Sequence, residues 1–231
     1  MSIFFLFDII QQNSTYAQEP SPGCAVYCEG AVVGSYYENI TLPGYPDCTI
    51  TFLVGWYRCP DGTVTLTFPK VYWQFPSGAC STFMARLYNG GTTPDWDFVS
   101  WIFDEGYHII SQKAFDQLYA AALPWDKYQY ECPNHGPATY RGAYESCVDY
   151  VYFDDPIHQI TRVEKQPCSD QVCCLLQTTY CYDTATHTDV ETDTWVQQPS
   201  PAPDCSSDIV GLPSGALFHS GCKVLCGAMI H

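Results

Sequence analysis

Carboxylate groups are the side chains of this sequence whose type and spacing could support chemistry. Asp95 and Asp97 form an Asp-x-Asp pair, and three further acids alternate along a later stretch, at Asp189, Glu191 and Asp193. Alternate residues of a strand share one face, so these three carboxylates are predicted to lie side by side. Hard cations prefer carboxylate oxygens, which makes both groups candidates for Ca²⁺. Neither group has the glycine and glutamate spacing of an EF-hand, so we expect no bound cofactor, with Ca²⁺ as the alternative.

Pairs of carboxylic acids also catalyse glycoside hydrolysis, one as the acid and the other as the base or nucleophile. The candidates for such a pair are Asp95, Asp97, Asp104, Glu105, Asp154 and Asp155. The separation of two side chains in space does not follow from their positions in one sequence, and acidic side chains are usually solvated. We therefore predict no catalytic residue among them and keep a hydrolase as an alternative.

Nucleophile motifs are missing from the sequence. There is no Gly-x-Ser-x-Gly elbow, and the closeness of Ser214-Gly215 to His219-Ser220-Gly221 does not make a catalytic triad. The histidines are scattered without the His-x-x-x-His spacing of metal sites, so each is predicted to be a surface or hydrogen-bonded residue. They are His108, His135, His158, His187, His219 and His231. These observations predict that the chain is not an enzyme.

Cysteine is unusually frequent. The fourteen cysteines are Cys24, Cys28, Cys48, Cys59, Cys80, Cys132, Cys147, Cys168, Cys173, Cys174, Cys181, Cys205, Cys222 and Cys226. None of their spacings is the Cys-x-x-Cys of zinc, iron–sulfur and redox sites. An even number of cysteines spread over the whole chain predicts disulfides, which persist outside a reducing cytosol. Neighbouring strand residues point to opposite faces, so Cys173 and Cys174 are expected to bond to two different partners.

The chain is strongly acidic. Its 25 acidic and 9 basic residues give a net charge of −16, which repels nucleic-acid phosphates and anionic lipid headgroups. We therefore predict no nucleic-acid partner. No segment beyond the N-terminus is long and apolar enough to span a membrane. The 18 tyrosines suit half-buried sheet surfaces and can also make adhesive ones.

The first residues have the features of a targeting segment. Residues 3–10 contain a short apolar run, and Thr15-Tyr16-Ala17 offers small residues to signal peptidase, with Gln18 as the mature start. Residues 1–17 are therefore predicted to be a signal or leader segment. Asp8 interrupts the run and no basic residue precedes it. The alternative is that the run is a strand that pairs with the sheet edge of a neighbouring subunit.

Residues 48–73 predict a β-hairpin. Residues 63–68 alternate cleanly between polar and apolar, with Val64, Leu66 and Phe68 on one face, and residues 49–54 alternate in part. Between these runs lies Cys59-Pro60-Asp61-Gly62, in which proline presets the first turn dihedral and glycine supplies a positive φ.

The apolar period changes after this hairpin. From Ile110 to Ala122 apolar residues fall at helical spacing, Ser111 is the expected cap and Pro124 ends the run. This pattern predicts one main helix at about 110–123, packed on the sheet, after a loop-rich connection over 81–107.

Strand-like sequence returns after this helix. Strands are predicted near 144–153, 158–164, 172–182 and 186–196. The predicted organisation is a leader, a β-rich domain with one helix, a proline-rich connector and a cysteine-containing tail stapled to the body, at 1–17, 18–196, 197–204 and 205–231.

The cysteine spacing of residues 168–231 carries a resemblance. Cys168-x4-Cys173-Cys174-x6-Cys181 is followed by Cys205-x16-Cys222-x3-Cys226. This pattern resembles the C-terminal part of cysteine-rich secreted bacterial proteins of unknown function. The resemblance implies export and an extracellular or cell-surface location, and it supplies no catalytic residue.

The expected fold is mainly β and disulfide-rich, an antiparallel sheet or sandwich with one main helix. Two functions stay open. The first is an exported structural or adhesive surface protein, a subunit of an extracellular filament or surface assembly, with itself or other surface components as partners. The second is a secreted carbohydrate-binding module or hydrolase that uses aromatic platforms and paired carboxylates.

Overall fold

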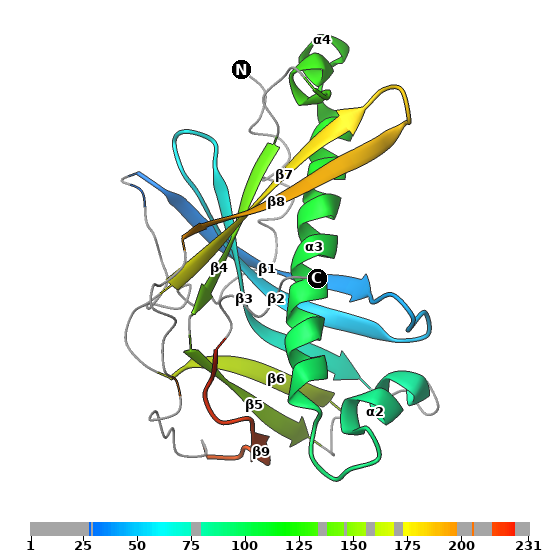
Figure 1. Cartoon of the computed structure of the whole chain (residues 1–231), viewed down its shortest axis with the longest axis vertical. Helices are drawn as coiled ribbons and strands as arrows, with labels where there is room; N and C mark the ends of the chain where they lie inside the picture. Colours follow the sequence, from blue (N-terminus) through cyan, green and yellow to red (C-terminus); the bar gives the residue numbers. More distant parts are fainter. Residues whose placement is uncertain are drawn as a thin grey trace.

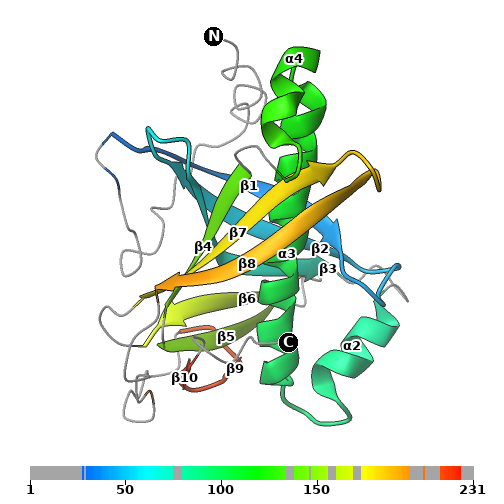
Figure 2. The same cartoon turned by 45° about the horizontal axis from the view of Figure 1, so that its top comes forward.

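The computed structural model describes residues 28, 30–74, 80–133, 138–145, 147–155, 160–168, 173–197, 205 and 214–224. Strands predominate, and one long helix runs across them (Figure 1 and Figure 2). The strands are β1 (Val32–Thr41), β2 (Thr49–Arg58), β3 (Val64–Gln74), β4 (Ala138–Glu145), β5 (Cys147–Asp155), β6 (Ile160–Pro167), β7 (Cys173–Asp183), β8 (Thr188–Gln197), β9 (Phe218–His219) and β10 (Lys223–Val224). The helices are α2 (Ser81–Tyr88), α3 (Trp96–Ala121), α4 (Pro124–Lys127) and the 3-10 turn η2 (Tyr128–Tyr130). The expected mainly β fold with one long helix is confirmed.

The sheet is mixed and forks at β3. Residues 70–74 of β3 pair antiparallel with β6, whereas residues 64–66 pair parallel with β4. One branch continues from β6 to β5, with β9 and β10 beside it, and the other continues through β4, β7 and β8. The sequence predicts an antiparallel sheet or sandwich, and the structure adds one parallel contact, between β3 and β4. Parallel neighbours need a long crossover, and here the segment between β3 and β4 contains the helices.

The hairpin predicted at 48–73 is confirmed, because β2 and β3 pair antiparallel. Gly62 has a φ of +90°, and its N–H donates to the carbonyl of Cys59 at 2.9 Å. The side chain of Asp61 accepts the N–H of Thr63 at 2.9 Å. The turn therefore uses glycine for its backbone and aspartate for its hydrogen bond, as the sequence predicts.

Helix α3 begins at Trp96, which corrects the predicted start near residue 110. Asp95 caps it, because its side chain accepts the backbone N–H groups of Asp97 and Phe98. The helix ends at Ala121, shortly before Pro124, as expected. Residues 81–107 therefore contain α2 and the first half of α3 and are not the loop-rich connection that the sequence predicts.

The pattern of the missed helical half is visible in its buried side chains. They repeat at four-residue intervals in two rows: Phe98, Ile102, Gly106 and Val99, Phe103, Tyr107. Glycine and aromatic residues have low helix propensity, and packing on the sheet overrides that preference. A Cβ at position 106 would lie 2.3 Å from the ring of Phe52, so glycine is required for the close approach of α3 to β2.

Aromatic side chains fill the space between α3 and the sheet. Phe103 packs edge-on against Phe52 of β2 and stacks on Tyr150 of β5, with ring centroids 6.1 and 5.5 Å apart. Further along the helix, Phe115 stacks on Tyr180 of β7 at 5.6 Å. The long helix α3 thus contacts both branches of the sheet. It is long enough to extend past β8, and the side chains that it presents to β8 are polar.

Disulfides cross-link the fold, as predicted. Five pairs are Cys28–Cys59, Cys48–Cys80, Cys132–Cys181, Cys147–Cys205 and Cys168–Cys222. Cys174 is also disulfide-bonded, while Cys24, Cys226 and the side chain of Cys173 lie outside the described residues. Such bonds indicate folding in an oxidising compartment. The bonds of Cys205 and Cys222 tie residues of the predicted tail to β5 and to the end of β6.

Several predictions fall where the chain is not described. The leader at 1–17, residues 198–204 of the connector, and His135, His158 and His231 lie outside the described residues. The stretch 144–153, predicted as one strand, contains the end of β4 and most of β5. Within the described ranges, no helix combines the length and apolar character needed to cross a membrane.

Candidate functional site

Polar side chains from two elements meet between α3 and β8. Helix α3 contributes three of them from one face, at multiples of four residues, and β8 contributes three from alternate positions. We call these residues the α3–β8 seam: Asp104, His108, Asp116, Asp189, Glu191 and Asp193. The acidic strand face that the sequence predicts therefore lies toward the long helix.

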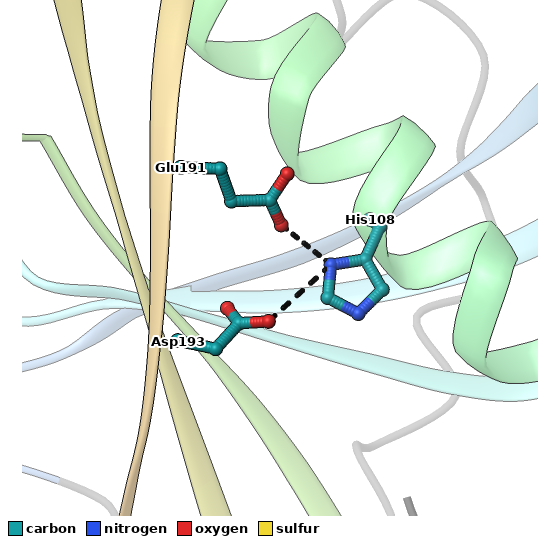
Figure 3. A group of neighbouring side chains, drawn as sticks. All are labelled: His108, Glu191 and Asp193. Atoms are coloured by element: carbon teal, nitrogen blue, oxygen red, sulfur yellow. Dashed lines mark hydrogen bonds and ion pairs between the residues drawn. The ribbon is translucent and has the colours of Figure 1, made fainter. Parts of the chain in front are cut away.

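His108 is the centre of one half of this seam (Figure 3). Its Nδ1 lies 2.6 Å from Oε1 of Glu191 and 3.9 Å from Oδ2 of Asp193. On the other side of the ring, Nε2 lies 3.9 Å from Oδ1 of Asp104. Both ring nitrogens thus face carboxylates, and the ligand atoms of His108, Glu191 and Asp193 all lie within 4.8 Å of one another.

These carboxylates determine the protonation of His108. Burial of the imidazole lowers its pKa, because it penalises the charged form. The hydrogen bond with Glu191 and the charges of Glu191, Asp104 and Asp193 outweigh that effect, so the pKa of His108 is raised above its ordinary value. The surrounding carboxylates therefore favour the protonated form of the imidazole.

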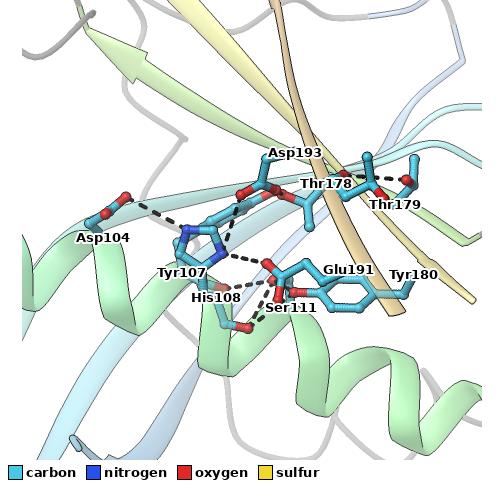
Figure 4. Close-up of polar contacts among 10 residues, drawn as sticks. Asp104, Tyr107, His108, Ser111, Thr178, Thr179, Tyr180, Glu191 and Asp193 are labelled. Carbon is cyan, nitrogen blue, oxygen red and sulfur yellow. Dashed lines mark hydrogen bonds and ion pairs between the residues drawn. The ribbon is translucent and has the colours of Figure 1, made fainter. Parts of the chain in front are cut away.

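A hydrogen-bonded chain from the core holds Asp193 in place (Figure 4). The hydroxyl of Tyr107 donates to Oγ1 of Thr178 at 2.9 Å, and Oγ1 donates onward to Oδ1 of Asp193 at 2.6 Å. Tyr107 and Thr178 are fully buried. One oxygen of Asp193 is therefore fixed from inside the protein, while the other faces His108.

A second buried group lies beneath Glu191. Ser111 donates to the carbonyl of Tyr107 at 2.8 Å, and its hydroxyl lies 2.9 Å from that of Tyr180. This arrangement corrects the prediction that Ser111 caps the helix. Tyr180 also hydrogen-bonds to Glu191. Burial is the main reason why the pKa of Tyr180 is raised, so its hydroxyl remains protonated and able to donate.

The other half of the seam is a pair of acids. The carboxyl groups of Asp116 and Asp189 hydrogen-bond to each other. Burial of Asp116 is the main cause of a rise in its pKa to about 6, and the hydrogen bond and the charge of Asp189 add to that rise. Two carboxyl groups at hydrogen-bonding distance share one proton, because both cannot easily be ionised there.

The Asp-x-Asp pair predicted as a cation site is engaged elsewhere. Asp95 caps α3 and forms an ion pair with Arg86 at 2.5 Å. The hydrogen bond from Arg86 is the main reason why the pKa of Asp95 is lowered. Asp97 pairs with Lys223 at 2.9 Å. The two carboxylates therefore serve different partners and do not converge on one point.

The remaining acids predicted as possible catalytic pairs have separate surroundings where their side chains are described. Asp154 accepts the hydroxyl of Thr161 at 3.2 Å, and Asp104 belongs to the seam. Glu105 follows on the next position of α3, and the side chain of Asp155 lies outside the described residues. The structure thus brings Asp104, Asp189, Glu191 and Asp193 of the predicted acids to one seam.

The serine and histidine near the C-terminus meet a buried acid without forming a triad. Asp149 is fully buried and lies 3.0 Å from Nδ1 of His219. It also accepts the N–H and the hydroxyl of Ser220, at 3.0 and 3.1 Å. A nucleophilic serine bonds to histidine rather than directly to the acid. These bonds hold the tail segment against β5.

His108 is the functional candidate that sequence reasoning missed. Its nearest partner, Glu191, is 83 residues away in the chain, and no local motif connects the two. The four-residue interval from Asp104 to His108 is the signal that could have placed them on one helix face. Together the seam offers a proton-binding imidazole and carboxylates at metal-ligand spacing.

The chain was compared with models of known protein families, with curated proteins and with solved structures. No match was found in any of the three comparisons.

Proposed function

We propose that this chain is an exported structural or adhesive surface protein that associates with a second copy of itself through the edge of β1. The observation that carries the proposal is the set of exposed apolar side chains on that edge, whose single charged residue is paired within the chain. The disulfides support the exported location, because thiols do not persist as disulfides in a reducing cytosol.

Strand β1 is an open edge of the sheet. It pairs with β2 on one side, and within the described ranges no strand pairs with its other side. Val32, Val33 and Tyr37 are exposed on it, with Val33 at 51%. Its single charged residue, Glu38, pairs with Lys113 of α3. Long apolar edges invite pairing with another strand, and most proteins protect them with charges or proline.

The edge strand of the branch formed by β4, β7 and β8 has the protection that β1 lacks. Within the described part of the chain, β8 pairs with β7 alone. It carries Asp189, Glu191 and Asp193, and Val190 is its exposed apolar residue, at 40%. Its negative charge repels an identical strand, so β8 is unsuited to self-pairing. Two β1 strands related by a twofold axis would pair antiparallel and extend the sheet across both copies.

Self-association of the exported, oxidised protein tests this proposal. Sedimentation equilibrium over a range of concentrations should show a monomer–dimer equilibrium. Val33→Lys places a charge on the β1 edge, and it should weaken dimerisation at least tenfold. Val190→Lys is the matched control, because it makes the same change on β8, and it should leave the dimerisation constant unchanged. Circular dichroism establishes that both variants are folded.

Two results would contradict the proposal. The first is a monomer at every concentration, and the second is an equal effect of the two lysine substitutions. Either result would mean that β1 is not an association edge. In a separate experiment, electron micrographs of the secreted material distinguish paired molecules from longer assemblies.

Carbohydrate binding is the second candidate, because an exposed aromatic surface follows the long helix. Trp125 of α4 is 73% exposed, and Leu123 and Tyr128 beside it are exposed too. Flat aromatic faces bury area at low entropic cost, which suits a binding platform. Affinity electrophoresis with polysaccharides tests this function. Retardation that is lost in Trp125→Ala would favour it, and unchanged mobility in every polysaccharide would oppose it.

A further inference from the structure

We propose that His108, Glu191 and Asp193 bind a divalent transition-metal ion, with Zn²⁺ as the best match to the ligands. The three side chains come from α3 and β8 and face one another across the seam (Figure 3). This inference does not depend on the proposed self-association, because β1 and the seam share no residue.

The donor atoms select the class of metal. One imidazole nitrogen and two carboxylate oxygens are a ligand set that suits Zn²⁺ and its first-row neighbours. Ca²⁺ requires six to eight oxygen ligands and is poorly matched to imidazole. From the sequence alone, the acidic face of β8 is a candidate for Ca²⁺. The structure places His108 beside that face, and this nitrogen ligand changes the expected ion. Three protein ligands leave one tetrahedral position for water.

The distances are close to those of a metal-bound site. Zinc at about 2.0–2.1 Å from each of two tetrahedral ligands separates these by about 3.3 Å. Nδ1 of His108 lies 2.6 Å from Glu191 and 3.9 Å from Asp193, one below and one above that separation. Each contact therefore changes by less than about 1 Å on binding. Glu191 and Asp193 are exposed on β8, so small side-chain rotations can make this adjustment while Thr178 keeps its hydrogen bond to Asp193.

Each ligand has a supporting contact of the kind that orients metal ligands. Asp104 lies 3.9 Å from Nε2 of His108, the ring nitrogen that faces away from the metal position. Thr178 donates to Asp193 from the core, and Tyr180 hydrogen-bonds to Glu191 (Figure 4). A cluster of acids on a solvated surface would lack these supporting contacts from buried side chains.

The charge of the seam favours a cation. Within the described ranges, no lysine or arginine pairs with Glu191 or Asp193, and His108 is their cationic partner. The acids Asp116 and Asp189 lie further along the same seam and add to the negative potential. Binding of the metal displaces the proton of Nδ1 to solvent. The bound ion would join β8 to the long helix and secure this edge of the sheet.

Calorimetric titration with Zn²⁺ tests the site directly. The untagged, oxidised, full-length protein is first freed of metal with EDTA and then exchanged into buffer. We expect one Zn²⁺ per chain, with release of protons. Glu191→Gln, Asp193→Asn and His108→Ala should each weaken this binding at least tenfold. Asp104→Asn should weaken binding by a smaller factor than any of these three substitutions, because it acts through His108.

Controls separate this site from general affinity for metal. His187 lies in the turn between β7 and β8 with a φ of +57°, so His187→Asn keeps its backbone unstrained and should leave binding unchanged. With Co²⁺ in place of Zn²⁺, the visible spectrum should indicate four-coordinate metal in the wild type and lose that signature in His108→Ala. The exposed positions of Glu191 and Asp193 make their variants safe for folding, which melting curves verify.

Three results would overturn the proposal. One is the absence of Zn²⁺ binding at a stoichiometry of one per chain. Another is binding that persists unchanged in folded Glu191→Gln and Asp193→Asn variants. The last is tighter binding of Ca²⁺ than of Zn²⁺ at these residues, which would mean that the imidazole is not a ligand.

Discussion

Asp116 of α3 and Asp189 of β8 form a hydrogen bond between two carboxyl groups, which requires one of them to be protonated. Burial of Asp116, followed by this bond and the charge of Asp189, raises its pKa from 3.8 to about 6. When the pKa of an acid is higher in the folded state than in the unfolded state, its contribution to stability is fully present at any pH below the unfolded-state pKa. That contribution is lost as the pH rises through the folded-state pKa. The junction of α3 with β8 should therefore weaken between about pH 4 and pH 7.

Replacement of Asp116 by asparagine should remove this pH dependence. The amide keeps a hydrogen bond with Asp189 and carries no charge. At about pH 7.5 the variant should be more stable by roughly 1 kcal/mol, a value reduced for solvent screening, which raises Tm by about 2–4 °C. Near pH 4 the two proteins should melt together. Melting curves in EDTA measure this, with Asp126→Asn on α4 as a control, and a difference that is independent of pH would contradict the shared proton.

A side chain added at Gly62 should destabilise the turn through its backbone angle and without a steric clash. Its φ is +90°, and an added Cβ would meet nothing within 4 Å. Gly62→Val should destabilise the protein by about 1–2 kcal/mol, because a β-branched residue resists positive φ. Gly62→Asn is the matched control and should cost less, since asparagine tolerates this region. Urea unfolding measures both, and equal midpoints for valine and glycine would show that the turn does not need positive φ.

A side chain added at Gly106 should destabilise the protein by a steric clash, whereas one added at Gly62 does so through the backbone angle. A Cβ at this position would lie 2.3 Å from Cζ of Phe52, a buried ring of β2. Gly106→Ala should therefore cost about 1–3 kcal/mol through overpacking, although alanine has the higher helix propensity. Phe52→Leu in the same chain should recover part of this loss. Additive costs in a double-mutant cycle would contradict the proposed contact.

The sequence predicts the parts of the fold that local chemistry determines. The hairpin at β2 and β3 follows from alternation and from Asp61-Gly62, and the end of α3 follows from Pro124. The start of α3 is different, because Gly106 and the aromatic residues before it disfavour a helix in isolation. Their contacts with Phe52 and Tyr150 supply the stabilisation, and such contacts between distant residues are not visible in a local pattern.

The candidate site shows the same division. The alternation of Asp189, Glu191 and Asp193 predicts one acidic face of a strand, which is what β8 presents. The position of that face against α3 depends on the fork of the sheet at β3, where one pairing is parallel. His108 therefore had no visible partner in the sequence. The pairing of Cys147 with Cys205 is equally non-local, since it joins residues 58 apart.

Thiol titration tests the oxidised state of the chain as a whole. Ellman's reagent, added to the protein in denaturant without reductant, should find almost no free thiol, because the described cysteines are all disulfide-bonded. After reduction the same assay should recover the fourteen cysteines of the sequence. Several free thiols before reduction would refute the oxidised structure and, with it, the argument for an oxidising compartment.

The Cys147–Cys205 bond should account for a large share of the stability of the tail. It closes a loop of 58 residues, and the chain-entropy model gives about 4 kcal/mol for a loop of that length. Replacement of both cysteines by alanine should therefore lower Tm by roughly 8–16 °C. Alanine at both positions leaves no unpaired thiol, and both sites are buried, so reshuffling of disulfides does not complicate the result. Calorimetry under non-reducing conditions measures the change, and a Tm within about 2 °C of wild type would mean that Asp149, which binds His219 and Ser220, holds the tail without this bond.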